Sequence, residues 1–176
     1  MERILAGLLL ATAVGASTMP PAQTETGVAV VKGTAEGSTV SGTVTFQETK
    51  AGLKVTAKLT GLPPGVHAFH IHQFGSCADA GKAAGSHYNP MNSPHGFLPK
   101  DGMKMAHGGD MGNITASADG TATLEIVLSH IALSNGKFNV AGRAVIVHEK
   151  ADDFSQPVGN AGGRIGCGVI SVTDQK

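Results

Sequence analysis

Short runs in which apolar and polar residues alternate dominate the chain from Gly27 onward, and turn signals separate these runs. No stretch keeps an apolar stripe at helical spacing for three turns, so the pattern predicts strands and no helices. The 25 glycines and 8 prolines supply the many tight turns that short strands need. The predicted strands span residues 28–32, 39–48, 53–62, 66–73, 112–118, 122–128, 144–149 and 164–172.

The connections between these strands favour an antiparallel, all-β arrangement. Asp119-Gly120 is a hairpin turn signal, and Pro63-Pro64-Gly65 ends one strand and directs the next. A polar stretch over 129–142 predicts a Greek-key crossover, so we expect an eight-stranded antiparallel Greek-key β-barrel or sandwich, immunoglobulin-like in architecture. Two segments, 74–111 and 150–163, are too long for hairpins and are expected to be functional loops.

An apolar run near the N-terminus predicts a secretory signal. Residues 4–14 are apolar, too few to span a bilayer, and small residues follow them. A buried N-terminal helix is disfavoured because Met19-Pro20-Pro21 breaks the chain. The expected organisation is a signal peptide over 1–16, a flexible linker over 17–26 and one domain over 27–176. Such a product is secreted, is free of the membrane after signal removal, and is periplasmic if the source is a bacterium.

The charge balance excludes one large class of partners. Thirteen basic and thirteen acidic residues give a formal net charge of zero, which leaves no wide basic surface for nucleic acid. Six phenylalanines, one tyrosine and no tryptophan offer little base stacking. The chain is also 41% hydrophobic and 15% charged, which argues against disorder.

Cys77 and Cys167 are the two cysteines of the chain. In an exported protein, an even pair favours a disulfide over two free thiols. The bridge would close a loop of about 90 residues, which the chain-entropy model values at about 4 to 5 kcal/mol. It would tie a central loop to the last strand.

Eight histidines are the anomaly of the composition. Alternation places His70 and His72 on one face of a strand and Phe69 and Ile71 on the other. The long loops and one strand end supply further candidate ligands, namely His87, His95, His107, Asp110 and His148. Together these side chains could form two metal sites, because imidazole suits zinc and copper and a mixed His/Asp set suits zinc.

Five segments, in order, resemble those of secreted copper/zinc superoxide dismutases. They are residues 69–75 (FHIHQFG), 85–90 (GSHYNP), 107–113 (HGGDMGN), 147–153 (VHEKADD) and 159–170 (GNAGGRIGCGVI). The resemblance covers nearly all of 28–172. It implies an oxidoreductase that converts superoxide to dioxygen and hydrogen peroxide, with one copper ion and one zinc ion per subunit as cofactors. Copper is the expected reactive centre, because it changes oxidation state and zinc does not.

The resemblance also implies metal ligands. The expected copper ligands are His70, His72, His87 and His148. The expected zinc ligands are His87, His95, His107 and Asp110. His87 would therefore bridge the two ions and take part in catalysis by carrying a proton.

Three further residues resemble supporting parts of such a site. Arg164 resembles the active-site arginine, which would orient the superoxide anion through charge-assisted hydrogen bonds. Asp152 resembles a carboxylate that links the rings of His70 and His95. His67 is expected to face inward and to support the ligands without binding metal.

From the residues alone, a metal carrier and a dinuclear hydrolase stay open. A carrier needs neither a shared ligand nor Arg164, and hydrolytic sites usually need more carboxylates than the one candidate here. A homodimer also stays open. Because the chain is neutral, any attraction of superoxide must be local, and three lysines of the first long loop are candidates for a positive rim, namely Lys82, Lys100 and Lys104. His130 is expected to be a solvated surface residue.

Overall fold

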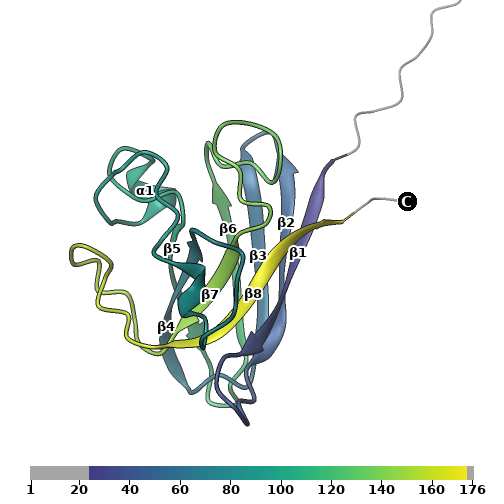
Figure 1. Ribbon diagram of the computed structural model, residues 1–176, viewed down its shortest axis with the longest axis vertical. Helices are drawn as coiled ribbons and strands as arrows, with labels where there is room; N and C mark the ends of the chain where they lie inside the picture. The colour runs from purple at the N-terminus through teal and green to yellow at the C-terminus, as the bar shows by residue number, and fades with distance from the viewer. Residues whose placement is uncertain (1–23, 174–176) are drawn as a thin grey trace, which may run out of the picture.

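The computed structural model describes residues 24–173, and its regular elements are almost all strands (Figure 1). The strands are β1 (Thr26–Gly33), β2 (Ser41–Thr49), β3 (Gly52–Thr60), β4 (Gly65–His72), β5 (Asp110–Ala116), β6 (Ala122–Leu128), β7 (Ala144–His148) and β8 (Arg164–Thr173). Their bounds agree with the predicted ones within two residues at each end. The prediction of no helices is wrong for two short turns, the 3-10 turn η1 (Lys82–Ala84) and α1 (Leu98–Asp101). Segments of three or four residues are too short to display a helical period.

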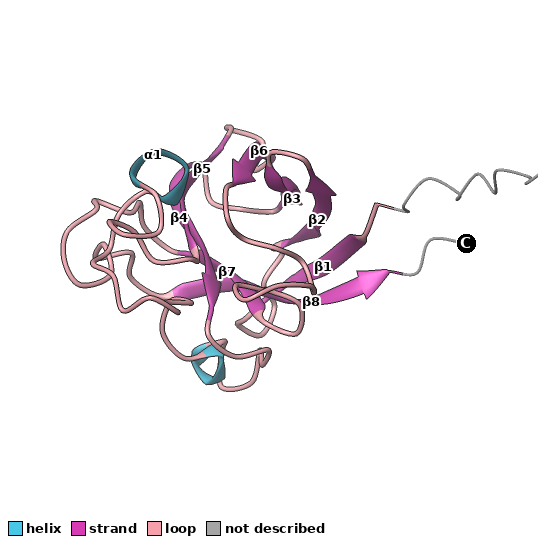
Figure 2. Ribbon diagram, turned by 90° about the horizontal axis from the view of Figure 1, so that it is seen from above, coloured by secondary structure: helices cyan, strands magenta, loops and turns pink. Residues whose placement is uncertain are grey.

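All eight strands form one closed antiparallel barrel, in the order β1-β2-β3-β6-β5-β4-β7-β8 (Figure 2). The last strand closes the barrel against the first, with Thr173 opposite Thr26 and Gly166 opposite Gly33. The connections from β3 to β4 and from β6 to β7 cross between strands that are not neighbours. The predicted Greek-key barrel is therefore confirmed.

Alternate side chains of the strands fill the barrel interior. In β3 the side chains with at most 1% exposure are Leu53, Val55, Ala57 and Leu59. Phe46 and Phe69 are the largest of the fully buried side chains. Burying one such side chain stabilises the fold by about 1.5–3 kcal/mol. A slip of one residue would expose the whole set, so the alternation also fixes the register of the strands.

The two long loops, 73–109 and 149–163, lie on the same side of the barrel (Figure 1). They contact each other directly. The backbone N–H of His95 donates to Oε1 of Gln156 at 2.9 Å, and Nε2 of Gln156 donates to the carbonyl of His95 at 2.8 Å. Residues 67–72 of β4 are buried without interruption, so both faces of this part of the strand are covered.

Cys77 and Cys167 form the predicted disulfide, with an S–S distance of 2.03 Å. It joins the first long loop to β8.

The predicted signal peptide over 1–16 lies outside the described residues, as does the predicted linker up to residue 23. The last linker residue, Thr26, is the first residue of β1. Across residues 24–173 we find no helix with the length and apolar character needed to cross a membrane.

Candidate metal centre

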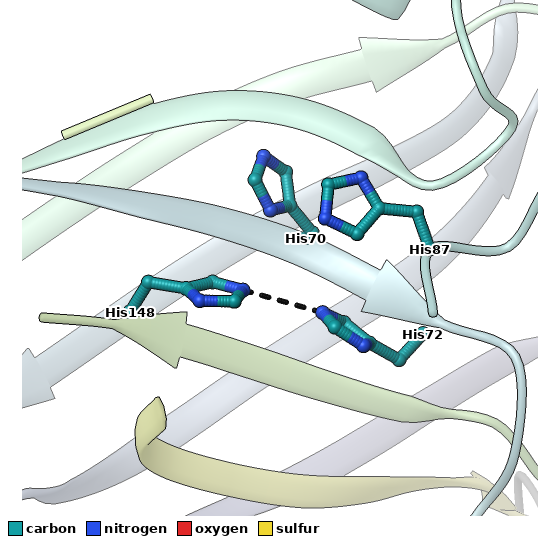
Figure 3. A group of neighbouring side chains, drawn as sticks. All are labelled: His70, His72, His87 and His148. Carbon is teal, nitrogen blue, oxygen red and sulfur yellow. Dashed lines mark hydrogen bonds between the residues drawn. The ribbon is translucent and has the colours of Figure 1, made fainter. Parts of the chain in front are cut away.

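The outer faces of β4 and β7 present three histidines beneath the long loops. His70 and His72 alternate with core residues of β4, and His148 ends the neighbouring strand β7. The Nε2 atoms of His72 and His148 lie 3.2 Å apart (Figure 3). His87 of the first long loop forms an isolated β-bridge with His72, and its ring centroid lies 4.1 Å from that of His70.

These four histidines form one donor group, and His87 also belongs to a second. Within each group the ligand atoms lie within 4.8 Å of one another, and every residue is buried. The first group contains His70, His72, His87 and His148. The second group contains His87, His95, His107 and Asp110. The fold thus brings together every residue expected to bind metal, in two sets that share His87.

Asp110, the first residue of β5, holds the second group together. Its Oδ1 accepts hydrogen bonds from Nδ1 of His87 at 2.8 Å and from Nδ1 of His107 at 3.1 Å. Its Oδ2 accepts the backbone N–H of His107 at 2.8 Å and that of Gly96 at 3.0 Å. Burial raises the pKa of Asp110, but contacts with His107, His87 and His95 outweigh burial and hold this pKa well below its usual range. The buried carboxylate therefore stays charged and favours a cation.

Three buried ring nitrogens have no hydrogen-bond partner among the described residues, namely Nδ1 of His70, of His95 and of His148. Nδ1 of His95 lies 2.9 Å from Oδ2 of Asp110, but outside hydrogen-bond geometry. Leaving a buried polar atom unpaired costs about 1–3 kcal/mol. A cation within each donor group would supply the missing partner. The residues present therefore fit metal ions: four imidazoles in one group, and three imidazoles with a carboxylate in the other.

Burial keeps three histidines of the first group neutral. Desolvation is the main cause that lowers the pKa of His72 to about 2, of His148 to about 3 and of His87 to about 4. Repulsion between positive charges lowers these values further, with Arg164 contributing for His72 and His148. Neutral imidazoles present the lone pairs that a metal ion requires.

The pKa of His95 is shifted in the opposite direction. Burial lowers its pKa, but contacts with Asp110 and Asp152 outweigh burial and raise the pKa of His95 to about 9. A metal ion that binds this ring must therefore displace a proton.

The metal-free protein is expected to lose stability in mild acid. The unfolded chain protonates His72, His87 and His148 near pH 6.5, whereas the lowered pKa values keep these rings neutral in the folded state down to about pH 4. The unfolded state thus binds more protons, and the free energy of unfolding falls as the pH falls, by up to about 1.4 kcal/mol per pH unit for each histidine. His95 opposes this trend only in part: its ring is protonated throughout in the folded state, and the unfolded chain takes up the same proton near pH 6.5, so His95 offsets at most one of the three histidines. Urea unfolding of the metal-free protein between about pH 7 and 5 measures the slope, and a flat profile would contradict the expectation.

Asp152, in the second long loop, joins the two donor groups. Its Oδ2 accepts a hydrogen bond from Nε2 of His70 at 2.8 Å, and its Oδ1 accepts one from Nε2 of His95 at 2.9 Å. Asn113 of β5 fixes the backbone of Asp152: its Oδ1 accepts the Asp152 N–H at 2.7 Å, and its Nδ2 donates to the Asp152 carbonyl at 3.0 Å. Gly159, with a φ of 74°, approaches so closely that a β-carbon would lie 1.9 Å from Oδ1 of Asp152. These contacts fix the orientation of both histidine rings.

Asn113 and Gly159 are site residues that the sequence does not predict. Asn113 begins an Asn-Ile-Thr glycosylation sequon, yet its amide is engaged with the backbone of Asp152. Gly159 begins the last of the five family-like segments, and that position is its only signal in the sequence.

Two histidines lie outside the donor groups. The ring nitrogens of His67 lie 2.9 Å from the carbonyl oxygen of His148 and 2.8 Å from that of Pro63. His67 thus connects β4 to the end of β7. His130 is exposed.

Arg164, the first residue of β8, lines a cavity of about 380 Å³ that also reaches His72 and His148. Its Nη1 donates to the carbonyl of Gly81 at 2.5 Å, and its Nη2 donates to the carbonyl of Gly85 at 2.6 Å. The same Gly85 carbonyl accepts a hydrogen bond from Nδ1 of His72 at 2.9 Å. The first long loop therefore positions both the guanidinium of Arg164 and the ring of His72.

A family model of copper/zinc superoxide dismutase matches residues 40–170. The chain belongs to the copper/zinc superoxide dismutase family. An extracellular Cu-Zn superoxide dismutase of Brugia pahangi is 38% identical over 161 residues, which cover 86% of this chain and 78% of that protein. A Cu-Zn superoxide dismutase of Onchocerca volvulus is 41% identical over 148 residues, 77% of this chain and 91% of that protein. Among solved structures, the clock protein EA4 matches with a TM-score of 0.75 and 35% identity, over 89% of this chain and 99% of that one.

As a copper/zinc superoxide dismutase, the protein is an oxidoreductase that converts superoxide to dioxygen and hydrogen peroxide. Its cofactors are copper and zinc, and the two histidine groups are compatible with them. Family membership favours this activity over the carrier and the hydrolase that the residues alone leave open.

Proposed function

We propose that the first donor group binds copper, that the second binds zinc, and that His87 is the ligand they share. One observation carries the assignment: Nδ1 of His87 contacts Asp110 in the second group, while the same ring belongs to the first group. An all-imidazole set suits copper, and a set with a carboxylate suits zinc.

When bound, copper supplies one-electron redox chemistry and zinc supplies charge without redox change. Arg164 orients the superoxide anion, because its planar guanidinium lines the cavity next to the first donor group. His87 holds a proton at Nε2 and delivers it to the anion as peroxide forms; the contact of its Nδ1 with Asp110 supports this role, because it leaves Nε2 on the other side of the ring.

Arg164→Ala is expected to lower the second-order rate constant for superoxide loss by about 10- to 100-fold, because hydrogen bonds from charged groups contribute about 1.5–3 kcal/mol. Arg164→Lys keeps the charge but not the planar fork, so its rate should fall between those of the alanine variant and the wild type. Copper and zinc contents are measured in both variants. An unchanged rate in fully metallated Arg164→Ala protein would remove Arg164 from the proposed mechanism.

A homodimer is the second part of the proposal. Three exposed apolar residues lie close together on one side of the barrel: Val30, Phe74 and Val169, which are 56%, 54% and 37% exposed. A β-carbon on Gly75, next to Phe74, would lie 3.4 Å from Val169, and one on Gly168 would lie 2.7 Å from the carbonyl oxygen of Val30. A second copy of the chain would remove this apolar surface from water.

Analytical ultracentrifugation of the wild-type protein is expected to give a dimer, and Phe74→Glu is expected to give a monomer, because a carboxylate in the contact would lose its hydration. Val127→Glu is the control: Val127 is an exposed apolar residue, at 37%, but it lies on β6, away from β1 and β8. A monomeric wild-type protein would overturn this part of the proposal.

Export is the third part of the proposal. The relative from Brugia pahangi is called extracellular. The Cys77–Cys167 disulfide supports the same location, because such bridges persist in oxidising compartments.

A further inference from the structure

A cavity of about 520 Å³ is lined by residues of the first long loop and of the crossover from β6 to β7. Two methionines of the loop, Met91 and Met103, line it together with His130 of the crossover. None of these three residues belongs to either donor group. The cavity therefore combines two thioether sulfurs and one imidazole, a set of donors that the reaction with superoxide does not use.

Short contacts join the segments that carry the two methionines. Asn89 closes a turn around Met91: its Oδ1 accepts the backbone N–H of Ser93 at 3.0 Å, and its Nδ2 donates to the carbonyl of Ser93 at 2.9 Å. Oγ of Ser93 donates in turn to the carbonyl of Met103 at 2.5 Å. The turn that presents Met91 is thus fastened directly to the backbone of Met103.

Gly108 brings the crossover against the same turn. A β-carbon on Gly108 would lie 3.2 Å from Cδ of Pro90 and 3.3 Å from Cδ1 of Ile131. Pro90 precedes Met91 and Ile131 follows His130, so the two segments converge at this glycine. His130 has a φ of 67°, a left-handed conformation that is uncommon outside glycine. Within residues 24–173, no group forms a hydrogen bond with its ring, so the ring nitrogens are available to a ligand.

The charged residues of the cavity do not select a hard cation. Asp101 and Lys104 both line it, and their formal charges cancel. Oδ2 of Asp101 already accepts the backbone N–H of Phe97, at 2.8 Å. Lys104, which the sequence suggests for a positive rim, lines this cavity and not that of Arg164. Selection of a ligand here therefore depends on the polarisable sulfurs.

The two sulfurs differ in their access to solvent. Met91 is 43% exposed, whereas Met103 is 8% exposed and packs in the core. An ion can therefore reach Met91 from solvent, while core packing holds Met103 in place. Methionine has three rotatable bonds and a polarisable sulfur, so the exposed side chain can adjust to the geometry that a bound ion prefers.

We propose that Met91, Met103 and His130 form a binding site for one Cu(I) ion, in addition to the two metal sites of the enzyme. Thioethers select Cu(I) because both partners are soft, and imidazole also suits copper. The site does not rest on the assignment of copper to the first donor group, because the two sets of ligands share no residue.

The first test is calorimetric titration of Ag(I) into the copper- and zinc-loaded enzyme in chloride-free buffer. Ag(I) is a monovalent ion with the same preference for sulfur, and it does not cycle between oxidation states as copper does. The wild-type enzyme should bind one Ag(I) ion per chain. Met91→Leu should bind it about ten-fold or more weakly, because loss of a residue that only orients a ligand already costs about 10- to 100-fold. Leucine conserves the volume of methionine, so the variant should fold.

Met105→Leu is the matched control. Met105 lies in the same loop and is 59% exposed, but it does not line the cavity. This variant should bind Ag(I) as the wild type does. Equal weakening in the two variants, or no weakening in Met91→Leu, would overturn the site. Copper and zinc contents are measured after the titration, since release of either ion would place Ag(I) in the donor groups and would also overturn the proposal.

The second test uses Cu(I) itself and the methyl signals of the methionines in nuclear magnetic resonance. One equivalent of Cu(I) is added, with ascorbate and without oxygen, to the loaded enzyme labelled with carbon-13 at the methionine methyl groups. The signals of Met91 and Met103 should shift, and those of Met105 and Met111 should not. A shift of Met105 as large as that of Met91 would overturn the proposal.

The superoxide rate separates this site from the metal centre. Fully loaded Met91→Leu enzyme should keep the wild-type rate and the wild-type cupric electron-spin spectrum, because Met91 lies outside both donor groups. A wrong assignment of the first donor group would appear in that spectrum and would leave the Ag(I) titration unchanged. The failure of one proposal is therefore distinguishable from the failure of the other.

Discussion

His148→Ala is expected to reduce superoxide dismutation by more than about 100-fold. His148 belongs to the first donor group, and its Nδ1 has no other partner among the described residues. Loss of a residue that only orients a ligand typically costs about 10- to 100-fold in metal affinity or activity. Loss of a ligand itself should therefore cost more.

The measurement pairs the rate with metal content. Metal-free His148→Ala protein should bind copper weakly but should still bind zinc through the second donor group. His130→Ala is the matched control, because it removes an exposed histidine outside both groups. Tight stoichiometric copper with a wild-type cupric electron-spin spectrum in His148→Ala would contradict the assignment.

Replacing both Cys77 and Cys167 with serine is expected to lower the free energy of unfolding by about 4 to 5 kcal/mol. The bridge joins residues 90 positions apart, so its loss greatly increases the conformational entropy of the unfolded chain. Domains are typically stable by about 5–15 kcal/mol, so the variant should be close to its stability limit.

The same double substitution should also lower the rate per bound copper. Cys77 lies close to the segment whose Gly81 and Gly85 carbonyls hold Arg164, and Cys167 lies three residues after that arginine. Denaturant unfolding measures the stability, and thiol-reduced wild-type protein is the comparison that changes no residue. An unfolding midpoint equal to that of the wild type would show that the bridge contributes little. A wild-type rate in the folded variant would show that other contacts are enough to hold Arg164.

The barrel could be predicted from the sequence because its physical cause is local. Alternation in β3 decides which side chains enter the core, and Asp119-Gly120 has the backbone freedom that a tight turn needs. α1 and η1 could not be predicted, because tertiary contacts and not an apolar period determine such short turns.

The candidate metal ligands could be predicted as a set, since histidine is uncommon and the family-like segments are specific. The residues that position these ligands could not be predicted from the sequence. Asn113 acts through its amide on the backbone of a residue 39 positions away, and nothing in the sequence links the two.

Because β8 closes the barrel, several features of the protein can form only at the end of its synthesis. During synthesis, one edge of β1 and one edge of β7 remain unpaired until β8 has been made. That strand also carries Arg164 and Cys167. Barrel closure, the disulfide and the arginine proposed to orient the anion are thus acquired together, so we expect a partly synthesised chain to be inactive.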